Sequence, residues 1–227
     1  LSDSHHSFLL PKEDDERKIT LEGGDIMVVS NNHILVGVSE RTSSEAAVKI
    51  TQTLFEMKLM DKVTIVKIPK KRDYMHIDTV FTKKKKDVWV MLGNFSRKAV
   101  KHEDESAVER ILEIKKEEKI KILQFNRNNP ENPISFESLE DLLVDISKTD
   151  LNCTGEVRFI FSGNNEFPYS AREQWTDSCN LLALKEGVVL GYDRNDKTTE
   201  AFRNAGFTII GVKELLQQLE NNSITID

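Results

Sequence analysis

The sequence repeats one order of predicted elements three times, and this repetition constrains the fold more than any other feature. In residues 19–68, two short apolar runs flank the turn 30–33 and predict a hairpin. An amphipathic helix follows over 45–57, where apolar residues three or four apart share one face, and a strand is predicted over 63–68. The unit is therefore two strands, a helix and a third strand.

The second unit, residues 75–161, has the same order with one interruption. Its hairpin strands are predicted over 75–82 and 87–92, with the lysines 83–86 forming the turn between them. A charged insertion from about residue 97 to residue 133 follows, and its alternating charges indicate a solvated elaboration rather than a binding arm. We expect a helix and a strand inside this insertion and a helix and a strand after it, over 105–118, 120–125, 136–146 and 157–161.

The third unit covers residues 172–212 and completes the repeat. Its hairpin is predicted from strands 181–184 and 188–192, followed by a helix over 197–204 and a strand over 207–212. A last helix is predicted over 213–219. Three units with one element order are an internal repeat, so we expect a single α/β domain over residues 1–227.

The composition is that of an ordinary soluble globular protein, since 38% of the 227 residues are hydrophobic and 31% are charged. The net charge of −6 disfavours a nucleic-acid surface, and no apolar run approaches the roughly 18 residues that a membrane span requires. The two cysteines, Cys153 and Cys179, form no disulfide framework and suit a reducing cytoplasm. The chain begins at Leu1 without a signal peptide, which leaves open that it is a piece of a longer protein.

An acidic residue stands where the first strand of each unit begins, at Asp25, Asp78 and Asp177. Units arranged around an axis would bring these three starts together at one central site. His76 lies two residues before Asp78, so on a strand both side chains point to the same side, and the carboxylate raises the basicity of the imidazole. Together with Glu22, these residues predict a carboxylate-rich pocket with one imidazole for general acid/base chemistry.

Three kinds of ligand fit such a pocket. A divalent metal could bind His76, Asp78 and Glu22, although no second histidine is well placed. Glycoside hydrolysis uses two carboxylates, but Trp175 is the single aromatic residue expected near these acids. A guanidinium presents five N–H donors in a plane and pairs bidentately with carboxylates, so it fits several acids best. Arg41, in the loop after the first hairpin, would hold a carboxylate at the other end, which points to arginine as the ligand.

Five short motifs resemble the arginine deiminase branch of the guanidino-modifying, or pentein, superfamily. They occur in the same order along residues 19–212, which is most of the chain. Members of this superfamily fold as fivefold pseudo-symmetric α/β propellers, so the resemblance implies that about three propeller units are visible here. Ser-Glu-Arg-Thr combined with Met-His-Ile-Asp-Thr is most similar to deiminases of free arginine. The motifs are Leu-Glu-Gly-Gly-Asp (21–25), Ser-Glu-Arg-Thr (39–42), Met-His-Ile-Asp-Thr-Val-Phe (75–81), Arg-Glu-Gln-Trp (172–175) and Gly-Tyr-Asp-Arg-Asn (191–195).

The resemblance implies a role for each matching residue. Glu22 would hold the guanidinium and shuttle protons, Asp78 would be the second carboxylate that binds it, and His76 would be the general acid/base. These three are the predicted catalytic residues. Arg41 would hold the carboxylate of the substrate, and Asp25, beside the Gly-Gly turn, would have a supporting role among the substrate-binding residues. In this family a cysteine thiolate attacks the guanidinium carbon, ammonia leaves, and water releases citrulline without a metal or another cofactor.

The chain departs from the family pattern at the nucleophile, which lies in a Gly-rich His-Cys segment that this sequence lacks. A further catalytic Asp upstream of the first motif is missing as well. Cys179 follows Asp177, which we place on the wall of the pocket as a substrate-binding residue. Neighbouring acids would raise the pKa of the Cys179 thiol, so we expect Cys179 and Cys153 to line the core.

The expected partner is therefore a small molecule, L-arginine, and homodimerisation stays open. The alternatives are a deiminase or amidinotransferase acting on another guanidino compound, such as agmatine, or an inactive module that only binds guanidinium groups.

Overall fold

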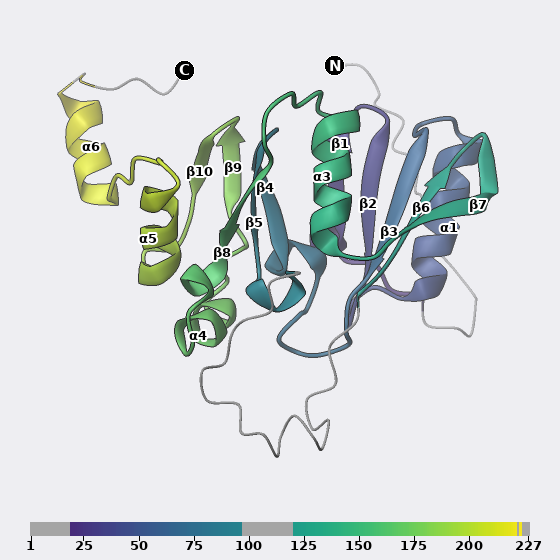
Figure 1. Cartoon of the computed structure of the whole chain (residues 1–227), viewed down its shortest axis with the longest axis horizontal. Helices are drawn as coiled ribbons and strands as arrows, with labels where there is room; N and C mark the ends of the chain where they lie inside the picture. The colour runs from purple at the N-terminus through teal and green to yellow at the C-terminus, as the bar shows by residue number, and fades with distance from the viewer. Residues whose placement is uncertain (1–18, 97–119, 222, 224–227) are drawn as a thin grey trace, which may run out of the picture.

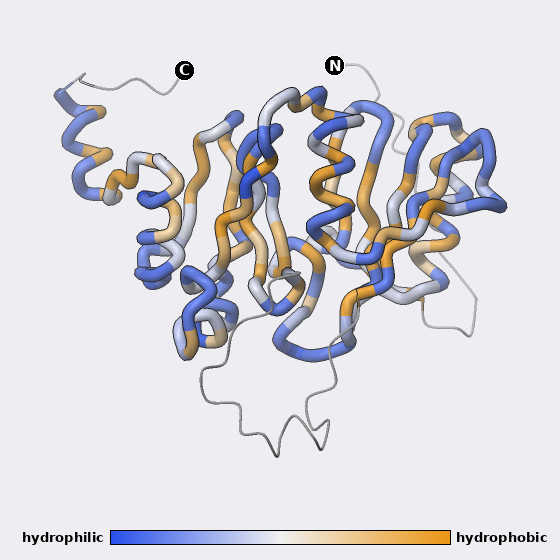
Figure 2. The backbone as a smooth tube through the Cα atoms, in the orientation of Figure 1, coloured by the Kyte–Doolittle hydropathy of each residue, from blue (hydrophilic) through white to orange (hydrophobic). Residues whose placement is uncertain are grey.

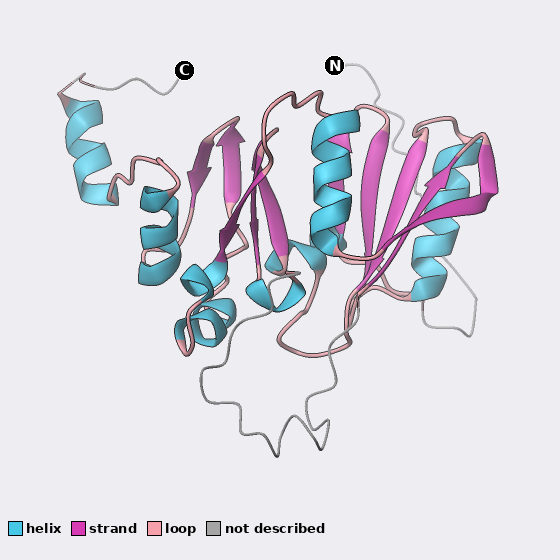
Figure 3. Ribbon diagram, in the orientation of Figure 1, coloured by secondary structure: helices cyan, strands magenta, loops and turns pink. Residues whose placement is uncertain are grey.

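The computed structural model describes residues 19–96, 120–221 and 223, which form a mixed α/β structure with three sheets (Figure 1). The first sheet has five strands in the order β1-β2-β3-β6-β7, the second has the order β4-β5-β8, and the third is the hairpin β10-β9. Helices lie beside the sheets, as the cyan ribbons of Figure 3 show. None of the helices in the described part of the chain is long and apolar enough to span a membrane.

The first unit has the predicted order of elements. β1 (Ile26–Ser30) and β2 (His33–Val38) form an antiparallel hairpin, α1 (Ser44–Glu56) follows, and β3 (Lys62–Lys67) returns parallel to β2. The helix begins where predicted because the hydroxyl of Ser43 accepts a hydrogen bond from a backbone N–H of the first turn. Every residue of β2 is buried, as expected for a strand that is covered on both faces.

The second unit also has two strands, a helix and a parallel third strand. β4 (Phe81–Lys85) pairs antiparallel with β5 (Val88–Met91), and β8 (Arg158–Phe161) pairs parallel with β5. The helix α3 (Leu139–Thr149) precedes β8 and is capped by Ser138, whose side chain accepts from the third helical N–H. Figure 2 shows hydrophobic and hydrophilic residues alternating along α3. The helix is therefore amphipathic, with one face that packs against the core.

The start of the second unit differs from the predicted strand over 75–82. Ile77–Thr79 form a 3-10 turn, η2, and the strand begins only at Phe81. The backbone N–H and the hydroxyl of Thr79 both donate to the carbonyl of His76, at 3.2 and 2.7 Å. This local bonding competes with strand pairing, which explains why a β-branched segment turns here.

The lysines expected in a hairpin turn lie mostly on the strand instead. Lys83, Lys84 and Lys85 belong to β4, and the side chain of Lys84 is only 2% exposed. The Nζ of Lys83 donates to the carbonyl of Val29 on β1, at 3.2 Å. Charge alone suggested a solvated turn, whereas alternation along the strand directs Lys84 into the protein.

The charged insertion contributes two strands to the first sheet. β6 (Lys121–Asn126) agrees with the predicted strand over 120–125 and pairs antiparallel with β3. Its neighbour β7 (Asn129–Phe136) was not predicted, because its prolines and asparagines are atypical of strands. The insertion is therefore partly a sheet extension, while the helix predicted over 105–118 lies outside the described residues.

The third unit begins with helix α4 (Tyr169–Trp175). The hairpin of β9 (Leu182–Lys185) and β10 (Val188–Leu190) follows, and then come α5 (Asp196–Asn204) and α6 (Val212–Glu220). The hairpin and both last helices agree with the predictions.

The predicted third strand over 207–212 is wrong. Residues 207–211 have no strand assignment, and the sheet of this unit contains only β9 and β10. Ile209 and Ile210 in this segment are exposed. The apolar pattern is present, but a strand forms only where a neighbouring strand pairs with its backbone groups. The strand β10, which would be that neighbour, has only three residues.

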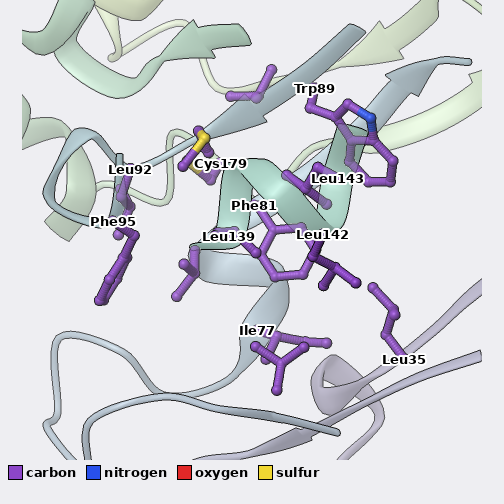
Figure 4. Close-up of a cluster of buried hydrophobic side chains, with 14 of the residues drawn as sticks. Leu35, Ile77, Phe81, Trp89, Leu92, Phe95, Leu139, Leu142, Leu143 and Cys179 are labelled. Atoms are coloured by element: carbon purple, nitrogen blue, oxygen red, sulfur yellow. The ribbon is translucent and has the colours of Figure 1, made fainter. Parts of the chain in front are cut away.

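One cluster of buried side chains extends through all three units. Figure 4 shows Leu139, Leu142 and Leu143 of α3 beside Phe81 and Trp89 of the second sheet. Residues from the first and third units belong to the same cluster, among them Leu35, Cys179 and Phe202.

A buried polar network fastens α3 to the first sheet. Asp150, at the end of α3, bonds through Oδ2 to Nδ1 of His33 at 2.9 Å and through Oδ1 to Nζ of Lys62 at 2.7 Å. The other ring nitrogen of His33 bonds to the hydroxyl of Thr64 at 2.8 Å. Burial raises the pKa of Asp150, but the hydrogen bonds from His33 and Lys62 outweigh burial and hold that pKa below its usual value.

Candidate functional site

Two 3-10 turns, which precede β1 and β4, lie against each other. The first, η1, spans Gly23–Asp25, and its Asp25 is fully buried. Asp25 Oδ2 accepts from the hydroxyl of Ser39 at 2.6 Å, and Oδ1 accepts from the backbone N–H of Ile77 in η2 at 3.0 Å. Oδ1 of Asp25 therefore links the first unit to the second, while Oδ2 holds the loop after β2 within the first unit.

Two glycines make this close approach possible. A Cβ added at Gly24 would lie 2.5 Å from Nδ1 of His76, and a Cβ at Gly37 would overlap the carboxylate of Asp25. Gly24 thus leaves room for the imidazole of His76, and Gly37 on β2 leaves room for the carboxylate of Asp25. The sequence alone gave no reason to single out Gly24 or Gly37, because the neighbours that restrict them come from distant segments.

His76 and Asp78 contact each other as predicted, although they do so across a turn and not on a strand. Nδ1 of His76 donates a hydrogen bond to Oδ1 of Asp78. Their side chains are 18% and 30% exposed, so both stay accessible from one side. The carboxylate fixes the tautomer, so Nε2 is the ring nitrogen of His76 outside this hydrogen bond.

Asp78 lies in a strongly acidic environment. Burial raises the pKa of Asp78, and the nearby carboxylates of Asp25 and Asp177 raise it further, while the hydrogen bond and charge of His76 act in the opposite direction. The three acids that begin the units therefore interact electrostatically. A cation placed among them would relieve this repulsion, so the arrangement favours a positively charged ligand.

Glu22 and Arg41 approach each other at the exposed edge of the cluster. Nη1 of Arg41 lies 3.7 Å from Oε1 of Glu22, and about half of each side chain is exposed. Nη2 of Arg41 also lies 3.9 Å from the sulfur of Met75. The sequence placed the acids and the arginine at opposite ends of a pocket, whereas the structure pairs Arg41 with Glu22.

Ser39 belongs to this cluster and was not singled out from the sequence. Besides donating to Asp25, its hydroxyl oxygen accepts from the backbone N–H groups of Arg41 at 3.0 Å and Thr42 at 3.2 Å. Ser39 thus sets the course of the loop that carries Arg41. The motif Ser-Glu-Arg-Thr contained the signal, because a serine two or three residues before such N–H groups is typical of a hydroxyl-capped turn.

The third unit reaches the cluster through Asp177. This residue follows α4 in a left-handed turn, with φ of 58°, and does not stand directly at a strand. Its Oδ2 lies 3.6 Å from Nη2 of Arg194, whose guanidinium stacks 4.1 Å from the ring centre of Tyr192. Arg194 was not predicted as a site residue, although it lies in the fifth motif.

Neither cysteine is placed for attack on a ligand. Cys179 is fully buried, and burial raises the pKa of its thiol to about 12, with Lys84 and Ser178 acting in the opposite direction. Cys153 is 5% exposed, and its Sγ lies 3.6 Å from the carbonyl oxygen of Gly155. Both thiols are free of disulfides and pack as small core residues.

No set of three or more His, Cys, Asp and Glu side chains is arranged to hold a metal ion within residues 19–96 and 120–221.

Comparisons with known proteins identify the family. The family model described as arginine deiminase matches residues 4–215. The arginine deiminases of Staphylococcus aureus strains JH9 and Newman are 34% identical over 195 residues, which is 85% of this chain and 42% of each relative. A solved structure of DDAH from Pseudomonas aeruginosa, a Cys-to-Ser mutant in complex with citrulline, matches 35% of this chain and 29% of its own at 28% identity and a TM-score of 0.29.

The chain thus spans about two fifths of the length of the curated relatives it matches. Because the family model covers nearly all of its residues, the chain belongs to the arginine deiminase family.

Proposed function

We propose that this chain forms the guanidinium-binding part of a hydrolase that converts L-arginine to L-citrulline and ammonia. The observation that carries the proposal is the acidic cluster around the His76–Asp78 pair, in which Asp25 and Asp177 help to raise the pKa of Asp78. A planar guanidinium can donate to more than one carboxylate at once and compensate their charge, and Asp78 and Glu22 are the acids proposed to accept from it. Membership of the arginine deiminase family supports the same substrate class.

Each residue has a defined part in this proposal. Asp78 and Glu22 bind the guanidinium of the substrate, and Nε2 of His76 gives a proton to the departing ammonia and later takes one from water. Arg41, which lies 3.7 Å from Glu22, exchanges partners when arginine binds. The substrate guanidinium then pairs with Glu22, and Arg41 pairs with the substrate carboxylate. Asp25 positions His76 through the backbone of Ile77 and does not contact the substrate.

The covalent steps require a thiolate. Its sulfur bonds to the guanidinium carbon, the C–N bond breaks, and ammonia leaves with a proton from His76. Water then adds to the same carbon, the C–S bond breaks, and citrulline and the thiolate are released. Cys179 and Cys153 are the two cysteines of the chain and both are buried, so we infer that the nucleophile lies outside these 227 residues.

A propeller of five units is the fold that we propose for the complete enzyme, with three of the units supplied by this chain. The repeated element order of the first two units supports this assignment. The two free thiols fit a reducing compartment such as the cytoplasm.

Citrulline release from L-arginine by the purified full-length protein tests the reaction. We expect activity in the wild type and a loss of at least about a hundredfold in Asp78→Asn, which keeps the shape but removes the charge. Cys179→Ser should retain activity within about tenfold, since only core packing changes. Arginine binding without any citrulline would identify an inactive binding module, and complete inactivity of a folded Cys179→Ser would make Cys179 the nucleophile.

Comparing arginine with agmatine tests which of the two is the substrate, because agmatine lacks the carboxylate that Arg41 is proposed to hold. In calorimetric titrations we expect Arg41→Ala to weaken arginine binding about tenfold, or 1.4 kcal/mol, and to leave agmatine binding unchanged. Arg72→Ala, which removes another exposed arginine, is the matched control. Equal arginine affinity in Arg41→Ala and wild type would remove Arg41 from the site.

A further inference from the structure

The fifth motif, residues 191–195, contacts the turn that carries Asp177. The motif joins β10 to α5, and α5 lies beside α4 (Figure 1). Thr176 and Asp177 follow directly after the last residue of α4. The motif and this acidic turn therefore meet in space, although α4 and α5 belong to opposite ends of the third unit in the sequence.

The side chain of Asn195 holds Thr176 through two hydrogen bonds. Its Nδ2 donates to the backbone carbonyl of Thr176 at 3.0 Å, and its Oδ1 accepts from the Thr176 hydroxyl. Asn195 occupies the N-cap position of α5 but makes no capping hydrogen bond there, because Glu173 accepts from the N–H groups that begin the helix. The Asn195 side chain is thus left to bond the turn, and the residue is only 3% exposed.

Arg194 contacts both residues of the turn. Its Nε donates to the carbonyl of Thr176 at 3.3 Å, and its Nη2 lies 3.6 Å from Oδ2 of Asp177. The guanidinium also lies over the ring of Tyr192, and this cation–π contact restricts the rotamers that Arg194 can adopt. A planar guanidinium makes two such contacts in one orientation, which the single ammonium of a lysine does less well.

Asp177 needs support of this kind because its backbone is left-handed, with φ of 58°. A residue other than glycine keeps such a conformation only where neighbouring groups hold it. The Asp177 side chain is 34% exposed, so water is available to a carboxylate that leaves the turn. Held in the turn, the carboxylate is close enough to Asp78 to raise the pKa of that acid.

We propose that Arg194 and Asn195 are positioning residues, which hold Asp177 where its negative charge attracts a guanidinium bound by Asp78. This inference rests on the proposed function, in which Asp78 binds the guanidinium of the substrate. Arg194 acts only through Asp177 and does not contact the substrate. Its own positive charge opposes the effect of Asp177 on the site, so positioning and simple charge screening predict opposite results when Arg194 is replaced.

The first test follows the titration of the Asp78 carboxyl group in the chain by carbon-13 NMR. In Arg194→Met the Asp177 carboxylate is released and no longer disfavours the charged form of Asp78, so the pKa of Asp78 should fall, as in Asp177→Asn. Adding Arg194→Met to Asp177→Asn should cause no further change. Asn195→Ala should shift the pKa in the same direction as Arg194→Met.

Arg203→Met is the matched control, since it removes another exposed arginine of the third unit, and it should titrate as the wild type does. A rise in the pKa of Asp78 in Arg194→Met would show that Arg194 only screens Asp177, and an unchanged pKa would show that it does not position Asp177. Either result overturns the proposal. Thermal unfolding establishes that each variant is folded, and Arg194→Met decides if Asn195→Ala is not.

The second test measures arginine binding to the full-length protein by calorimetry. We expect Arg194→Met to weaken binding at least about threefold and Arg194→Lys, which keeps the charge, to weaken it less. In the Asp177→Asn background, Arg194→Met should leave the remaining affinity unchanged. Tighter binding by Arg194→Met than by the wild type would again identify screening and overturn the proposal.

The positioning role and the proposed function can fail separately. If the wild-type protein does not bind arginine, the proposed function fails, while the titration of Asp78 still decides whether Arg194 holds Asp177. If the wild type binds arginine and Arg194→Met changes neither the titration nor the affinity, only the positioning role is overturned.

Discussion

The second and third units have the same predicted element order, but only the second forms a three-stranded sheet that a helix covers. In the second, β8 pairs parallel with β5, α3 covers the sheet, and Trp89 is fully buried. In the third, only β9 and β10 pair, and Leu182 is 63% exposed. A hairpin alone is marginally stable in water, so the third strand and the covering helix are what convert a repeat into a packed unit.

The third unit is nevertheless attached to the second at defined points. The backbone N–H of Gly187, in the turn between β9 and β10, donates to the carbonyl of Lys84 at 2.9 Å. The hydroxyl of Thr82 donates to the carbonyl of Cys179. Glu173 of α4 is fully buried and accepts from the N–H groups of Lys197 and Thr198, which begin α5. The third unit is therefore held by polar contacts as well as by its residues in the shared apolar cluster, among them Cys179 and Phe202, while β9 of its own hairpin stays exposed.

The largest effect is expected from Trp89→Ala in the second unit. It removes a fully buried ring whose Nε1 donates to the Ser147 hydroxyl at 2.8 Å, and it should lower the free energy of unfolding by about 3–5 kcal/mol. Trp175→Ala is the matched control, since Trp175 is 62% exposed and should lose at most about 0.5 kcal/mol. Urea unfolding followed by circular dichroism measures both. Equal losses would show that the two units are packed alike.

Lys84→Met, at the junction of the two units, should increase stability in a pH-dependent way. Burial lowers the pKa of Lys84 to about 7, and its Nζ has no hydrogen-bond partner in the described part of the chain. Below pH 7 the folded protein must bury the charge, and this cost decreases as pH rises from 7 towards 10.5, where the unfolded lysine also loses its proton. The variant should gain on the order of 3 kcal/mol at pH 6 and much less at pH 9.5.

Thermal unfolding at several pH values measures this gain, and Lys86→Met on the exposed side of the turn is its control. A gain that is the same at pH 6 and pH 9.5 would mean that Lys84 is not buried in its charged form.

Glu173→Gln tests the polar attachment of the third unit. The substitution keeps the shape but replaces one acceptor oxygen by an NH₂ group facing the N–H groups that begin α5. We expect a loss of about 1–3 kcal/mol, with faster hydrogen exchange in α5 than in α3. Equal protection of both helices in the variant would show that Glu173 does not hold α5.

The smallest effect is expected from Leu184→Ser on β9. The Leu184 side chain is 52% exposed, so its replacement should change the free energy of unfolding by at most about 0.5 kcal/mol. Leu142→Ser in α3, where the side chain is fully buried, should cost several times more. A large loss in Leu184→Ser would indicate that the third unit is packed in solution more tightly than its exposure suggests.

Periodicity and spacing were sufficient for much of the fold. The hairpin, the helix and the third strand of the first unit, and α3, α5 and α6, follow from apolar patterning and caps such as Ser43, whereas the parallel pairing of β3 with β2 was not predicted. The pairing of His76 with Asp78 also followed from their spacing of two, although a turn and not a strand brings them together. These features are local, because the residues that determine them lie within about one helical turn of each other.

Other features depend on partners far along the chain. Ser39 and Gly24 gain their importance from Asp25 and His76, and the strand expected over 207–212 fails for lack of a partner. Lys84 was expected in solvent because it lies in a run of lysines, yet the register of β4 buries it.

By itself, then, the sequence determined the element order of the first two units, the identity of the acids near the starts of the units and the family to which the motifs point, because these depend on residue type and short spacing. The tertiary structure alone decided that Asp25 binds Ile77, that Arg41 faces Glu22 and that both cysteines are buried. These outcomes arise from contacts between segments separated by tens of residues or from the register between strands. The local pattern of apolar and polar residues predicts neither the contacts nor the register.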